Sequence, residues 1–107
     1  MALNYTALID TRANGYGFIS RNKAQEVRKL LRTHRIKLDR PVPITGYNGS
    51  DTEELQWATE ANLLVMGRIE ARVPFLEANL GRHDIILGRK WLADHRILVD
   101  CYRNRLI

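Results

Sequence analysis

The sequence contains one cysteine, three prolines and no long apolar run. A single cysteine excludes an intramolecular disulfide, so we expect a reducing, intracellular compartment, the cytoplasm. No segment approaches the roughly 20 apolar residues that a membrane-spanning helix needs. The N-terminal segment has neither the charged nor the apolar region of a signal peptide. These absences argue against a secreted or membrane-spanning protein.

Residues that bind metals or nucleotides are also few. The soft-metal ligands do not have the spacing of a zinc site; they are His34, His83, His95 and Cys101. The segment Gly15-Tyr16-Gly17 lacks the glycine spacing of a dinucleotide-binding turn. Cys101 stands in a β-rich stretch, where a cysteine is more often a small buried apolar residue than a nucleophile. We therefore expect neither a metal nor a cofactor.

The composition is that of an ordinary globular protein. The chain has 107 residues, of which 45% are apolar and 27% are charged, and we expect residues 1–107 to form a single domain. A domain of this size has a modest core, which oligomerisation would supplement. The net charge of +5 is carried by basic residues spread along the chain. This distribution favours a solvated basic surface over a nucleic-acid-binding role for the domain.

Local patterns predict a mainly β fold with one main helix. A strand is expected over Tyr5–Ile9, and Ser20 is suited to cap a helix over about residues 21–33. An apolar face of that helix is predicted from residues at helical spacing, namely Ala24, Val27, Leu30, Leu31 and His34.

The rest of the chain predicts further strands and one short helix. Pro41 and Pro43 exclude a helix around them, and two or three strands are expected between residues 51 and 81. Residues 55–64 also suit a helix by propensity alone. The remaining expected elements are strands over 44–47, 85–87, 97–101 and 106–107 and a short helix over 90–95.

Two short motifs stand near opposite ends of the sequence. The first is Ala7-Leu8-Ile9-Asp10-Thr11, an apolar strand that ends in an acid and a hydroxyl. Alone it is compatible with an ordinary residue that starts a turn. The second is Ile86-Leu87-Gly88-Arg89, which precedes the predicted short helix.

Together the two motifs resemble those of retropepsins, the aspartic proteases of retroviruses and LTR retrotransposons, and the C-terminal third is similar to the gypsy-type version. The resemblance implies a retropepsin-like closed β-barrel or sandwich that forms a two-fold homodimer. It also implies an endopeptidase that processes a polyprotein. Peptide hydrolysis without a covalent intermediate needs a base that activates water and an acid that protonates the leaving amine. Two adjacent carboxylates that share one proton can do both, so a chain with one Asp10 needs a second copy of itself.

The resemblance also assigns roles to individual residues. Thr11 would brace the two acidic loops across the dimer. The residues that would line the bound polypeptide are Arg12, Ala13, Asn14 and Ile86. A flap over the substrate is implied for about residues 44–57, with Gly46, Tyr47, Asn48 and Gly49 at its turn. Of the two tryptophans, Trp57 is expected to be a flap-tip contact and Trp91 a core residue.

Two departures from the family pattern bear on activity. Arg12 stands where the family has glycine, and a fixed positive charge near the dyad favours its doubly ionised form, which lacks the general acid. An impaired aspartic endopeptidase is one hypothesis, and an inactive dimerisation or peptide-binding module is the other. A side chain of Arg12 that points out of the cleft would leave more activity. Nine residues precede Asp10, so we expect the dimer interface to use residues 98–101 and 106–107 instead of a leading strand.

Overall fold

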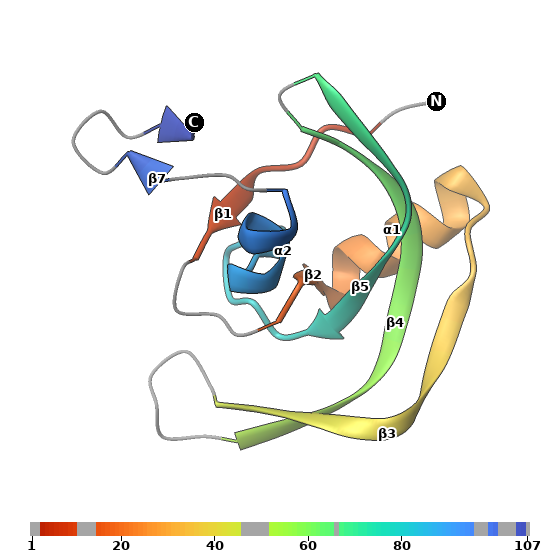
Figure 1. Cartoon of the computed structure of the whole chain (residues 1–107). Coiled ribbons are helices and arrows are strands. Elements are labelled where there is room, and N and C mark those ends of the chain that lie inside the picture. Colours follow the sequence, from red (N-terminus) through yellow and green to blue (C-terminus); the bar gives the residue numbers. More distant parts are fainter. Residues whose placement is uncertain are drawn as a thin grey trace.

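The computed structural model describes residues 3–10, 15–45, 52–65, 67–95, 99–100 and 105–106. Strands dominate this part of the chain, which confirms the mainly β class predicted from the sequence (Figure 1). The elements in chain order are β1 (Ala7–Ile9), β2 (Gly17–Ser20), α1 (Arg21–Leu31), β3 (Arg35–Thr45), β4 (Thr52–Val65), β5 (Arg68–Ala78), β6 (Ile85–Leu87), α2 (Arg89–Asp94), β7 (Val99–Asp100) and β8 (Arg105–Leu106).

Six strands form one sheet in the order β1-β6-β2-β5-β4-β3, and β7 pairs with β8 separately. Two parallel pairings, β1 with β6 and β2 with β5, flank the antiparallel pair of β2 and β6. Helix α1 follows β2 just as α2 follows β6. The N-terminal and C-terminal segments are thus interleaved at one end of the sheet, where β6 lies between β1 and β2, and neither forms its own half of the fold.

The sheet is buried on both faces around β2, β6 and the second half of β5. Figure 1 shows β4 and β5 as one long curved hairpin with α2 on its concave side. One cluster joins Ile19, Val27, Phe75, Leu87 and Trp91 from strands and helices. Successive side chains of a strand point to opposite faces, and the second cluster accordingly takes the alternate residues, including Phe18, Leu55, Leu80 and Ile86. Burial on both sides explains why β6 is apolar at every position.

Helix α1 begins as predicted and ends earlier. Ser20 is extended, with φ −63° and ψ 148°, and its Oγ accepts a hydrogen bond from the backbone N of Lys23 at 3.3 Å. The helix ends at Leu31 because Arg32 is left-handed, with φ 54°. The predicted apolar face is wider than the buried one, since Ala24 and Val27 are buried but Leu30 is 42% exposed and His34 is exposed.

Strand β3 is longer than the short strand predicted over residues 44–47, and it begins nine residues earlier. It runs from Arg35 to Thr45 and contains both Pro41 and Pro43. Prolines lack an N–H and are tolerated on edge strands and at bulges. Strand β3 lies at the edge of the sheet, and its register shifts between Lys37 and Val42.

Other elements follow the prediction more closely. Residues 55–64 belong to strand β4 and not to a helix, while β6 matches the expected range. Helix α2 begins and ends one residue before the predicted range, and Trp91 is 2% exposed, as expected of a core residue. Strand β2 was not predicted. Strand β1 has three residues and is shorter than the predicted strand over Tyr5–Ile9. Of the strands predicted over 97–101 and 106–107, the described residues include Val99–Asp100 in β7 and Leu106 in β8, and the others lie outside the described part of the chain.

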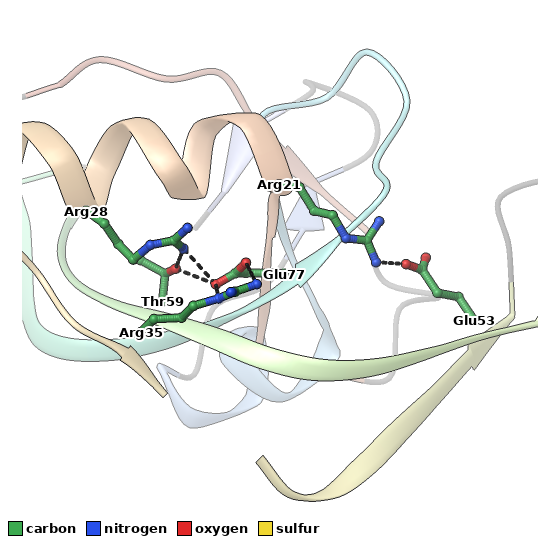
Figure 2. A network of polar contacts seen from close by, with 6 residues as sticks. All are labelled: Arg21, Arg28, Arg35, Glu53, Thr59 and Glu77. Atoms are coloured by element: carbon green, nitrogen blue, oxygen red, sulfur yellow. Dashed lines mark hydrogen bonds and ion pairs between the residues drawn. The ribbon is translucent and has the colours of Figure 1, made fainter. Parts of the chain in front are cut away.

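Glu77 of β5 lies at the centre of a buried polar network (Figure 2). Arg28 of α1 donates from Nη1 to Glu77 Oε2 at 2.8 Å and to Thr59 Oγ1 at 2.7 Å. Arg35 of β3 donates from Nε and Nη2 to the two carboxylate oxygens, at 3.2 and 3.1 Å. The hydroxyl of Thr59 in β4 donates to Oε2 at 2.8 Å. Three elements are therefore joined to β5 through one carboxylate.

This network fixes the positions of α1 and β3 on the sheet. The side chain of Glu77 is only 3% exposed, against 22% for Arg28 and 41% for Arg35. A buried charge is costly unless it is paired and hydrogen bonded, and removal of one partner leaves the others uncompensated. The guanidinium carbon of Arg35 also lies 4.0 Å from the ring centre of Trp57, which adds a cation–π contact.

We predict that Glu77→Gln lowers the free energy of unfolding by about 3 kcal/mol, because two arginines lose their charged acceptor. Urea unfolding followed by circular dichroism measures this change. Glu54→Gln is the matched control, since Glu54 is exposed on β4, and it should change stability by less than about 0.5 kcal/mol. Equal effects of the two substitutions would show that the network does not stabilise the fold.

Candidate active site

Asp10 lies where the two sequence motifs meet. Strand β1 pairs in parallel with β6, with Ile9 opposite Leu87. The backbone N–H of Asp10 then donates to the carbonyl oxygen of Leu87 at 3.0 Å. The predicted acid and the predicted Ile-Leu-Gly segment are thus adjacent, although they stand near opposite ends of the chain.

The residues that follow the 11–14 segment also bond to the second motif. The backbone N of Gly88 donates to the carbonyl oxygen of Tyr16 at 2.9 Å, and the N of Lys90 donates to that of Gly15 at 3.4 Å. A side chain at Gly15 would collide with the ring of Phe18, so this close approach requires glycine. The residues on both sides of the 11–14 segment are therefore bonded to the second motif and to the start of α2.

A polar cluster holds the side chain of Tyr16. The Tyr16 hydroxyl donates to Glu70 Oε1 of β5, and Glu70 Oε2 lies 3.2 Å from His95 Nε2. The His95 ring stacks on Trp91 of α2, with the ring centres 4.6 Å apart. Burial raises the pKa of the Tyr16 hydroxyl above its usual range, and the bond to Glu70 raises it further. No pattern in the sequence indicates this cluster, because its members stand in three separate segments of the chain without a common spacing.

The candidate site faces the β3–β4 hairpin. Alternation along β1 places Asp10 on the side of Leu8, and Leu8 pairs with Ile86 of β6. Both residues belong to the apolar cluster that also includes Val42 and Ile44 of β3 and Leu55 of β4. The hairpin expected from the sequence to be the flap therefore packs over the face on which Asp10 lies.

Most of the other predicted site residues lie outside the described part of the chain. These are Thr11, Arg12, Ala13 and Asn14 after the acid, and Gly46, Tyr47, Asn48 and Gly49 in the flap turn. Ile86 is described, and it is 8% exposed within the apolar cluster. The prediction that Trp57 is a flap-tip contact is wrong. Trp57 pairs with Lys37 at the base of the β3–β4 hairpin, on the far side of the register shift from the turn.

Three further observations concern other kinds of site. A groove of about 720 Å³ lies between the N-terminal segment, the end of α1 and the β4–β5 hairpin, and neither Asp10 nor Ile86 lines it. Among the described residues, no group of three or more His, Cys, Asp or Glu side chains is placed to hold a metal ion. No helix in the described ranges is long and apolar enough to cross a membrane.

The interleaved sheet, with an acid at the end of β1 bonded to the Ile-Leu-Gly strand, defines a retropepsin-like domain. Comparison with protein families agrees, because residues 6–107 match the model of the PEG10/RTL1 protease domain. The chain belongs to this family. It is also similar to a solved structure, the retroviral protease-like domain of Ddi1 from Leishmania major. That similarity has 17% sequence identity and a TM-score of 0.50, and it covers 96% of this chain and 73% of the other. No curated protein matches the sequence significantly.

Alkaline pH should destabilise the protein through two tyrosines. Burial is the largest cause that raises the pKa of Tyr5 and Tyr16, and hydrogen bonds to Glu26 and Glu70 add to it. The folded state therefore keeps protons that the unfolded chain releases near pH 10. The stabilising contribution is complete below that pH, begins to fall as the pH rises above it, and is lost as the pH reaches the raised pKa of the folded state.

Urea unfolding between pH 9 and 11 measures this dependence. We expect the free energy of unfolding to fall over this interval, and to fall less in the double variant Tyr5→Phe/Tyr16→Phe. An identical fall in both proteins would contradict the assignment to these hydroxyls.

Proposed function

We propose that this domain is an aspartic endopeptidase that cleaves a polyprotein of retrotransposon or retroviral type. The observation that carries the proposal is the position of Asp10 at the end of β1, bonded through its N–H to Leu87 beside Gly88. Membership of a protease-domain family supports the reaction class. The similarity to the Ddi1 domain supports the fold alone.

The proposed chemistry needs two copies of Asp10. One carboxylate of the pair, ionised, takes a proton from water, and the other, protonated, gives a proton to the leaving amine. A symmetric homodimer would bring the two Asp10 side chains together on its axis. Two carboxylates held close together share one proton, because a second ionisation would place two negative charges side by side.

The proposal also gives roles to the residues around the acid. Thr11 braces the two acidic loops, while residues 12–14 and Ile86 contact the polypeptide substrate. The β3–β4 hairpin closes over it. Arg12 weakens the enzyme by adding bulk and a fixed positive charge two positions after the acid. The second candidate function, an inactive dimerisation or peptide-binding module, is favoured by that same residue.

Asp10→Asn should abolish peptide cleavage, because it removes the carboxylate that shares the proton. Cleavage of a generic peptide library at pH about 4 to 6, the range in which such a dyad holds one proton, tests this. Asp39→Asn, an exposed change on β3, is the matched control and should leave the rate unchanged. Sedimentation velocity on the same samples should show a dimer. Cleavage by the Asp10→Asn protein at the parent rate would refute the mechanism, and a parent protein without activity would favour the binding module.

Arg12→Gly should raise kcat/KM at least tenfold, which corresponds to about 1.4 kcal/mol of transition-state stabilisation. The positive charge favours ionised carboxylates, so its removal should also shift the acid side of the pH profile upward. Cleavage rates of the parent and the variant across pH measure both effects. An unchanged rate and profile would mean that Arg12 does not act on the dyad.

A further inference from the structure

The net charge of the protein comes from one short segment. Residues 28–40 contain six of the 17 lysines and arginines but only one of the 12 acidic residues, Asp39. The remaining 11 basic and 11 acidic residues cancel. The segment thus carries a net charge of +5, equal to that of the whole chain, because the local excesses elsewhere cancel, such as five basic and two acidic residues over 89–107 against four acidic residues over 51–60.

The fold presents this segment on one flank of the molecule. It comprises the end of α1, the turn after it and the first half of β3, the edge strand of the sheet (Figure 1). Two of its cations, Arg28 and Arg35, bind the buried Glu77. The other four are exposed and form no ion pair with another described residue; they are Lys29, Arg32, Lys37 and Arg40.

An aromatic ring lies within this surface. Trp57 is half-buried on β4, with the guanidinium of Arg35 at 4.0 Å and the Nζ of Lys37 at 5.7 Å from its ring centre. The ring thus lies between Arg35, which Glu77 neutralises, and the exposed cation Lys37 on the same edge strand. Exposed cations on an edge strand suit a ligand with regularly repeated negative charge.

We propose that Lys29, Arg32, Lys37 and Arg40 form a binding surface for the phosphate backbone of nucleic acid, without base specificity. Insertion into a lipid surface would need apolar side chains that project beside the cations. Only two apolar side chains of the segment are exposed, Leu30 at 42% and Ile36 at 36%, while Leu31 and Leu38 are partly buried, so the segment presents less apolar surface than a membrane-inserting face. Phosphate contacts need only exposed cations at fixed positions. The surface is separate from Asp10, and its function does not depend on protease activity.

The test uses a fluorescent 20-nucleotide oligouridylate and a DNA duplex of the same length, with anisotropy measured between 50 and 200 mM salt. In the variant Lys29→Gln/Arg32→Gln/Lys37→Gln/Arg40→Gln we expect the Kd for the single strand to rise at least tenfold at 50 mM salt. Loss of four phosphate contacts should reduce the slope of log K against log salt by roughly 3. Circular dichroism checks that the variant is folded.

The matched control removes the same charge elsewhere, with Arg68→Gln/Arg72→Gln/Arg82→Gln/Lys90→Gln, all at exposed positions. It should bind both probes within twofold of the parent. Equal weakening by the two variants would overturn the proposal, since it would show an effect of net charge alone. So would failure of the parent to bind either nucleic acid at 50 mM salt. Binding to phosphatidylserine vesicles but not to the oligonucleotides would assign the surface to membranes and would overturn it as well.

Discussion

The parallel pairing of β1 with β6 is the contact on which the candidate site depends. Each strand has three residues, and its partner stands 78 positions away in the sequence. Without this pairing, Asp10 would be an acid after a short strand, and Gly88 would be a glycine before a short helix. Strand β2 holds β6 from the other side, and β5 holds β2. Strands β5 and β2 therefore hold β6 in place, and β6 in turn fixes the three residues of β1 that precede Asp10.

The same pairing of β1 with β6 keeps Asp10 apart from Asp84, the acid just before β6. Asp84 precedes β6, and its Oδ2 accepts a hydrogen bond from the backbone N of Thr6, before β1, at 3.3 Å. Thr6 and Asp10 are four positions apart, which is about 13 Å of extended chain at 3.3 Å per residue. Asp84 is therefore at the opposite end of the strand pair and cannot share a proton with Asp10. The backbone pairing therefore excludes a dyad of Asp10 with Asp84.

The sequence predicted the elements with strong local signals and missed those that depend on the sheet. Ser20 identified the start of α1, and the apolar run 85–87 identified β6, because capping and burial act locally. The short strand β2 has no such signal and exists because β5 and β6 pair with it on both sides. The family resemblance identified the two motifs but did not predict their adjacency, since spacing in sequence does not encode a parallel pair. The Glu77 network and the Tyr16 cluster each join residues far apart in the chain, so no pattern in the sequence indicates them.

The prolines of β3 have a consequence for solubility. An edge strand presents unpaired N–H and C=O groups that can recruit a strand of another molecule, and such pairing leads to aggregation. Strand β3 is the long edge of this sheet, and Pro41, Pro43 and the register shift interrupt its row of donors. Basic side chains along its first half add like-charge repulsion between copies. Growth of the sheet past β3 is therefore opposed in two ways, by the interrupted donors and by the repulsion between like charges.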